Sequence, residues 1–240
     1  MSPESVEIEV TLVRIPPAEQ DIEQSIWAEA DEQCVSTSSR RQLNSNGILC
    51  GVVSHQLPAR LRQLLDKNSA TITDSGTIDV MSRMHREQWR SGQRRNYVTT
   101  SAGKTIVLLQ QNENAAQLSG TTYDDAQGFI SARAFPQPDG TVNVELIPEI
   151  HYGPIQRQWT AGEAGYQIEA GQQRKILDHL KMEVNLSLGQ SFMVSSTLDA
   201  KGVGDALFVD RDNGDPQKKV FLIRLARTQR DELFDNLTDE

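Results

Sequence analysis

The segment LKMEVNLSL, residues 180–188, alternates strictly between apolar and polar side chains. The apolar residues are Leu180, Met182, Val184, Leu186 and Leu188. Successive side chains of a β-strand point to opposite faces of the sheet, so this pattern predicts a strand that turns these residues toward a core. An amphipathic helix would instead repeat its apolar residues every three to four positions. We expect a second strand to follow, after a break at Gly189.

Similar strand-like segments fill the chain from Ile72 onward, separated by Gly, Pro, Asn and Asp. They read NYVTTS (96–101), TIVLLQQ (105–111), GFISARAF (128–135), TVNVELIPEIHY (141–152), YQIEA (166–170), SFMVSST (191–197) and KVFLIRLART (219–228). TIDVMSRMHREQWR (77–90) fits either a strand or a helix. Strands at this density, with no helices between them, predict an antiparallel sheet system, a sandwich or a part-barrel.

The first 70 residues contain segments with the two-residue period of a strand and segments with the three-to-four-residue period of a helix. SVEIEVTLVRI (5–15) alternates as a half-buried strand, and GILCGVVS (47–54) indicates a short buried one. Helical spacing appears at 19–32 and in LPARLRQLLDK (57–67), where Pro58 suits a first helical position. STSSRRQLNSNG (36–47) is loop-like in its first half.

The predicted fold class is therefore α+β, mainly β. We expect a small α/β segment at 1–70, a β domain at 71–230 and an acidic tail at 231–240 that frays.

Charge and hydropathy exclude several classes of protein. The chain has 240 residues and a formal net charge of −9, which argues against a general affinity for nucleic acid or anionic membranes. No apolar run approaches the ~18 residues of a membrane helix. The opening MSPESVEIEV has neither a basic head nor an apolar stretch, so we expect no signal peptide in this chain. Cys34 and Cys50 fit a disulfide and a pair of free thiols equally well.

The segment SAGKT (101–105) resembles the end of a phosphate-binding loop, G-x-x-x-x-G-K-[ST]. That loop needs an earlier glycine, where this chain has Val98, and a helix after it, where this chain has the strand-like IVLLQQ. We therefore expect no nucleotide here. The segment instead matches three others in which a glycine precedes Gln and a strand. The four glycines are Gly92, Gly103, Gly171 and Gly189, and each is predicted to close a turn.

Other candidate sites lack the spacing that their chemistry needs. DRDNGD (210–215) has glycine in the fifth place rather than the sixth, so it favours an acidic turn over a calcium loop. The histidines His55, His85, His151 and His179 have no second ligand at metal-binding spacing. Ser195-Ser196 lacks a nucleophile elbow, and Asp124-Asp125 lies in a loop-like segment. We assign no catalytic, cofactor-binding or metal-binding residue and predict that the protein is not an enzyme.

One basic cluster stands out in this acidic chain. It comprises Arg83, Arg86, Trp89, Arg90, Arg94 and Arg95. Arg and Trp are favoured anchors at interfaces, so the cluster is a candidate patch for an acidic partner, a phosphate or a neighbouring subunit. The alternative is a strand or hairpin whose arginines balance local acids.

The β segments resemble the core domain of bacterial secretins, the ring-forming outer-membrane channels of type II and type III secretion systems. VEIEVTLVRI is similar to the strand that opens that core, and GFISARAFPQPDGTVNVELIPEI to its hairpin with a D-G turn. LKMEVNLSLGQSFMVSST and KKVFLIRLART resemble its closing strands. The resemblance covers about 100–230 and the opening strand. LDAKGVGDALFVDRDNGDPQ stands where secretins carry a Gly-rich, Pro-containing gate segment.

This resemblance implies a secretin-like β protein that acts in assembly or protein–protein interaction, linked to protein secretion at the cell envelope. It implies protein partners or self-association. The net charge argues against a nucleic-acid partner, and no motif in the sequence indicates a cofactor. Without the resemblance, the cytoplasm is the expected location. Two alternatives stay open: a soluble β-rich enzyme or ligand-binding domain with an unrecognised site, and a soluble adaptor that uses the arginine cluster.

Overall fold

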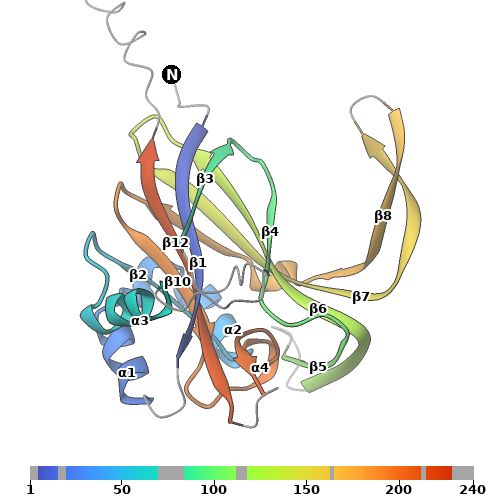
Figure 1. Cartoon of the computed structure of the whole chain (residues 1–240), viewed down its shortest axis with the longest axis horizontal. Helices are drawn as coiled ribbons and strands as arrows, with labels where there is room; N and C mark the ends of the chain where they lie inside the picture. Colours follow the sequence, from blue (N-terminus) through green and yellow to red (C-terminus); the bar gives the residue numbers. More distant parts are fainter. Residues whose placement is uncertain are drawn as a thin grey trace, which may run out of the picture.

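The computed structural model of the protein is built around two antiparallel sheets (Figure 1). The structure describes residues 5–15, 20–69, 84–111, 118–162, 165–211 and 215–228. Within these ranges the chain forms two six-stranded sheets and four α-helices, which confirms the predicted class, α+β and mainly β. No helix in the described ranges is long and apolar enough to span a membrane.

The first sheet, sheet A, brings together the two ends of the described chain. Its order is β2-β10-β12-β1-β3, with β11 beside β12. The strands are β1 (Ser5–Ile15), β2 (Ile48–Val53), β3 (His85–Arg90), β10 (Ser191–Ser196), β11 (Val209–Asp210) and β12 (Gln217–Thr228). β1 and β12 pair from Val6–Thr228 to Ile15–Lys218, with one register shift after Glu7. Sheet A thus takes β1 and β2 from the first 70 residues and its other strands from the remainder.

The second sheet, sheet B, contains the longest strands. Its order is β4-β6-β7-β8, with β5 also on β6 and β9 on β7. The strands are β4 (Arg95–Val98), β5 (Lys104–Gln111), β6 (Leu118–Pro136), β7 (Val142–Gly162), β8 (Gly165–Ile176) and β9 (Met182–Leu186). β7 and β8 continue beyond the rest of sheet B as a two-stranded ribbon that projects away from the body of the molecule (Figure 1).

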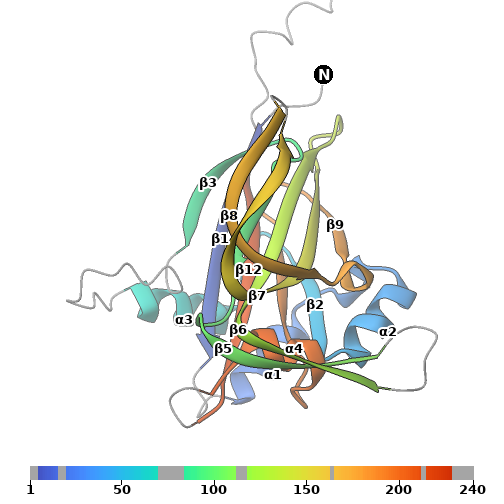
Figure 2. The ribbon, with the colours of Figure 1, turned by 90° about the vertical axis from the view of Figure 1, so that its right-hand side faces the viewer.

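The two sheets and the helices make three layers. One apolar cluster lies between the sheets and includes Trp89, Phe192 and Phe221. A second cluster lies on the other face of sheet A and includes Trp27 and Leu61 from its covering helices. Sheet A is therefore buried on both faces, which explains why β1 is buried continuously from Ile8 to Val13 rather than only half-buried as its alternation predicts. Sheet B keeps one face open to solvent. Figure 2 shows the helices at the end of the molecule opposite the ribbon tip.

Two of the four helices were predicted and two were not. The helices are α1 (Gln20–Ala28), α2 (Thr37–Ser45), α3 (Ala59–Ser69) and α4 (Gly202–Phe208), with short 3₁₀ turns η2 (Glu32–Cys34) and η3 (Asp178–Leu180). α1 and α3 match the predicted helices. The serine-rich start of α2 looked like a loop because serine favours turns, but Ser36 caps the helix by accepting a bond from the Ser39 amide at 3.1 Å. α4 packs so tightly that a Cβ on Gly204 would lie 1.7 Å from the Gly47 carbonyl oxygen.

Three of the four predicted glycine turns are present. Gly92, Gly103 and Gly189 have φ of 70°, 72° and 81°, in the region that favours glycine. The prediction for Gly171 was wrong, because this residue lies inside β8 and pairs with Gln156 of β7. Its local sequence resembles the others, but pairing with a distant strand decides its conformation.

The alternating segment at residues 180–188 forms β9 almost as expected. Leu180, Met182, Val184 and Leu186 are buried, whereas Leu188 is 52% exposed. The strand ends at Leu186, and the turn at 188–189 carries Leu188 out of the core, so its predicted burial was wrong.

We predict that Val184→Asp lowers the free energy of unfolding by about 3 kcal/mol or more, because it places a charge on the buried face of β9. Val184 is 4% exposed and lies opposite Val144. Asn185→Asp is the matched control, since it adds the same charge to the exposed face and should cost less than about 1 kcal/mol. Chemical denaturation measures both. Equal losses in the two variants would contradict the assigned register.

Candidate interaction surface

The arginine cluster lies on the hairpin that carries the chain from sheet A to sheet B. β3 belongs to sheet A and β4 to sheet B, and the turn at Gly92 joins them. Arg86 contacts both acids of the neighbouring strand, with Nε 2.9 Å from Glu7 Oε1 and Nη2 2.5 Å from Glu9 Oε1. Arg95 Nη1 lies 3.9 Å from Glu87 Oε2. Arg83 falls outside the described residues.

Trp89 belongs to the core and not to an exposed patch. It is fully buried, and its ring stacks on Tyr97 at a centroid distance of 6.1 Å. Its Nε1 donates to Glu87 Oε2 at 3.3 Å, and the Tyr97 hydroxyl donates to the same oxygen at 3.0 Å. The alternation of β3 turns Trp89 inward and leaves Arg86 and Arg90 outward. The expectation that Trp89 anchors a surface together with the arginines is therefore corrected.

The inward face of this hairpin also perturbs a tyrosine. Burial, followed by the charge of Glu87 and the hydrogen bond to it, raises the pKa of the Tyr97 hydroxyl above its ordinary value. Tyr97 also contacts Phe221 of β12 at a centroid distance of 5.6 Å. The ring thus connects the two sheets and stays neutral at physiological pH.

Arg94 forms an ion pair with the buried Glu149 on the outer face of sheet B. Both oxygens of the Glu149 carboxylate accept hydrogen bonds from Arg94 Nη2, and the Glu149 side chain is only 1% exposed. His151 Nε2 lies 3.2 Å from the same carboxylate, and its ring stacks on Phe129 at 4.1 Å. Burial alone would raise the pKa of Glu149, but the hydrogen bond with His151 and the charge and hydrogen bonds of Arg94 outweigh it, so the pKa lies below its ordinary value.

Three apolar side chains lie in one row with Glu149 across sheet B. The strand registers place Val98, Phe129, Glu149 and Ile176 opposite one another across β4, β6, β7 and β8. Val98 is 39% exposed and Ile176 is 37% exposed. We call these four residues the outer row. It crosses sheet B at the base of the ribbon and places two exposed apolar side chains beside the buried Glu149.

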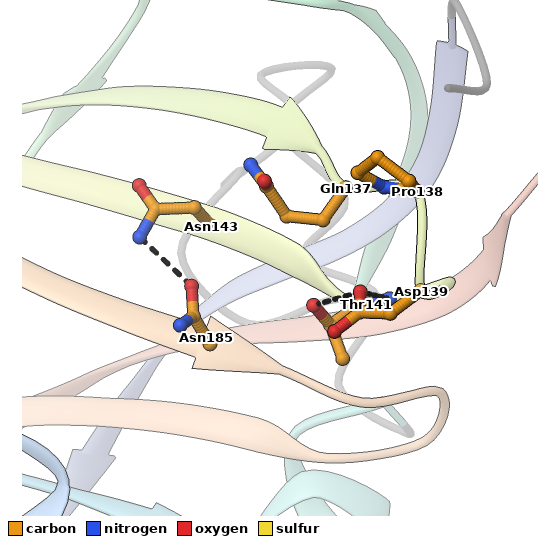
Figure 3. Close-up of a pocket in the computed structure, with 6 residues that line it drawn as sticks. All are labelled: Gln137, Pro138, Asp139, Thr141, Asn143 and Asn185. Atoms are coloured by element: carbon orange, nitrogen blue, oxygen red, sulfur yellow. Dashed lines mark hydrogen bonds between the residues drawn. The ribbon is translucent and has the colours of Figure 1, made fainter. Parts of the chain in front are cut away.

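A polar hollow lies beside the β6–β7 turn (Figure 3). It has a volume of about 460 Å³ and is lined by Gln137, Pro138, Asp139, Thr141, Asn143 and Asn185. Its only carboxylate, Asp139, already accepts bonds from the Thr141 amide at 2.9 Å and hydroxyl at 2.7 Å. Asn143 donates to Asn185 at 2.9 Å. These groups stabilise the turn and pair two strands, and the six lining residues include no nucleophile paired with a base.

Lys104 of the segment SAGKT has an ion-pair partner. Lys104 begins β5, so a strand rather than a helix follows Gly103. The Lys104 Nζ lies 3.5 Å from Asp210 Oδ1. Part of DRDNGD, residues 212–214, falls outside the described ranges. No three His, Cys, Asp or Glu side chains within the described ranges are grouped so that they could hold a metal ion.

Comparison with protein-family models, with curated proteins and with solved structures found no match. The resemblance to secretins therefore stays a prediction from the quoted segments. The outer row and the role of Glu149 were not predicted, because Glu149 meets Arg94 only through strand registers that span 55 residues of chain.

We predict that Glu149→Gln lowers the free energy of unfolding by about 2 kcal/mol at pH 7, because it weakens charge-assisted hydrogen bonds in a buried setting. The folded-state pKa of Glu149 is depressed, so its contribution is present above the unfolded pKa and is lost as pH falls through the folded one. The stability difference between wild type and variant should therefore narrow below about pH 4.5.

Denaturation midpoints measured from pH 7 to pH 3 test this dependence. Asp66→Asn, which removes an exposed carboxylate from α3, controls for the loss of one negative charge. A difference between wild type and Glu149→Gln that stays constant over the whole pH range would contradict the assigned role of the carboxylate.

Proposed function

We propose that this chain is a non-enzymatic, secretin-like β protein that acts in assembly or protein–protein interaction and is linked to protein secretion at the cell envelope. The observation that carries the proposal is the β7–β8 ribbon. β7 has 21 residues and β8 has 12, well above the mode of about 5–6 for a strand. Within the described residues β8 pairs with β7 alone, so its other edge presents unpaired backbone groups.

A projecting two-stranded ribbon is unfavourable for a protein that stays monomeric. Two strands without further neighbours are marginal in water, and an open edge can pair with a strand of another chain. Ile155, in the bulge where the ribbon leaves sheet B, is 74% exposed, and the outer row lies at the same base. Backbone pairing along β8, together with apolar contact at its base, supports association through this part of the molecule.

Charge favours an acidic surface as the partner. Arg174 and Lys175 are exposed on β8, while the chain as a whole carries a net charge of −9. A second copy of the chain therefore offers the required acidity, as does an acidic protein. Arg90 provides a second exposed basic position, on the edge strand β3, where Arg86 is already paired with Glu7 and Glu9. Contacts between exposed charges are screened beyond about 10 Å at 0.1 M salt, so association should weaken as salt rises.

The direct test is to shorten the ribbon without disturbing the sheet. Removal of residues 157–170 and closure of Gln156 to Gly171 by Asn-Gly keeps the register, because these two residues are already opposite each other. Light scattering should find the wild type in species larger than one chain of 26.8 kDa and the shortened variant as a monomer. Negative-stain microscopy should show closed rings only for the wild type.

Two controls complete the experiment. Arg90→Ser tests the exposed part of the arginine cluster and spares Arg86 and Arg94, whose loss would remove guanidinium partners of the buried Glu9 and Glu149. Unchanged melting of the shortened variant shows that the body remains folded. Wild type that stays monomeric at every concentration and salt, or a shortened variant that assembles equally well, would overturn the proposal.

A further inference from the structure

The two cysteines lie side by side although 15 residues separate them in the chain. Cys34 ends η2 and is half-buried, and Cys50 lies in β2 and is buried. Their thiols are in hydrogen-bond contact. The two segments are held together by the bridge between Asp31 and Val52, whose backbone groups exchange hydrogen bonds of 2.8 and 3.0 Å. Both side chains face the same apolar cluster between the sheets.

The contact shifts the pKa values of the two thiols in opposite directions. The hydrogen bond with Cys50 lowers the pKa of the Cys34 thiol despite its partial burial. The same hydrogen bond, with burial and the charge of Cys34, raises the pKa of Cys50. The thiolate is the reactive form of cysteine. Cys34 is therefore both the more accessible and the more readily ionised member of the pair.

We propose that Cys34 and Cys50 form a modification site at which a peroxide oxidises the two thiols to an intramolecular disulfide. In the first step the Cys34 thiolate attacks one peroxide oxygen, the O–O bond breaks and a proton converts the leaving hydroxide to water. In the second step the Cys50 sulfur attacks the resulting sulfenic acid, and the S–O bond breaks. The Cys50 proton leaves with the hydroxyl group as a second water, so two thiols are oxidised and one peroxide is reduced.

The disulfide would enclose the segment that contains α2. A closed loop of this length restricts the unfolded chain, so the oxidised form should melt roughly 6–12 °C above the reduced form. It would also fix η2 to β2, the edge strand of sheet A. The cysteine pair belongs to η2 and β2 and not to the β7–β8 ribbon, so its oxidation does not depend on the proposed function.

Peptide mapping of the full chain tests the modification. The reduced protein is treated with hydrogen peroxide, unfolded, alkylated and digested. We expect a cross-linked peptide pair containing Cys34 and Cys50, which dithiothreitol separates again. Before oxidation, iodoacetamide should label Cys34 at least about tenfold faster than Cys50 in the native protein.

Cysteine variants distinguish coupled oxidation of the two thiols from independent oxidation of each one. Cys50→Ala should halt the reaction at Cys34, which then carries sulfenic or sulfinic acid, and Cys34→Ser should leave Cys50 reduced. The proposal is overturned if peroxide yields over-oxidised Cys34 beside alkylatable Cys50 in the wild type, or only disulfides between chains. These wild-type outcomes test the disulfide even if a variant fails to fold.

Discussion

The pairing of β1 with β12 is the interaction on which the rest of the structure depends. It joins strands that lie more than two hundred residues apart, as the contact between Arg224 and Glu9 illustrates with a separation of 215. Closing so long a segment is entropically costly, and burial of both faces of sheet A offsets that cost. β3 pairs with β1, β10 pairs with β12, and β2 pairs with β10, so each remaining long strand of sheet A reaches the sheet through these two. Both apolar clusters include residues of β1 and β12.

This closed body contrasts with the ribbon that leaves it. Sheet B packs one face on sheet A and keeps the other open, and β7–β8 continues past the region where a third strand of the described ranges supports it. The ion pair of Arg94 and Glu149 lies where the two parts meet, because it ties the β3–β4 hairpin to β7 close to the base of the ribbon. The described residues thus combine a body buried between two sheets with a strand, β8, that has one unpaired edge, and the proposal of assembly through β8 follows from that combination.

Local patterns in the sequence predict much of this fold and little of the surface. Alternation identifies β9, and helical spacing identifies α1 and α3, because each reflects one buried face. α4 is missed because its glycines, of which Gly204 permits close packing against Gly47, look like loop residues in isolation. Trp89 groups with the arginines along the chain, yet the pleat of β3 sends it to the opposite face. The outer row and the cysteine contact arise from registers between distant segments, and no short window of sequence contains them.

Hydrogen exchange of the full chain, followed by mass spectrometry in dilute and in concentrated solution, tests the contrast between body and ribbon most directly. Amides of β1 and β12 should exchange slowly in both solutions, since they open only when sheet A opens. Amides of β8 should exchange quickly in dilute protein and become protected on association. Fast exchange in β1 and β12 would contradict the closed body. Exchange in β8 that stays the same while light scattering shows assembly would contradict the role of its edge.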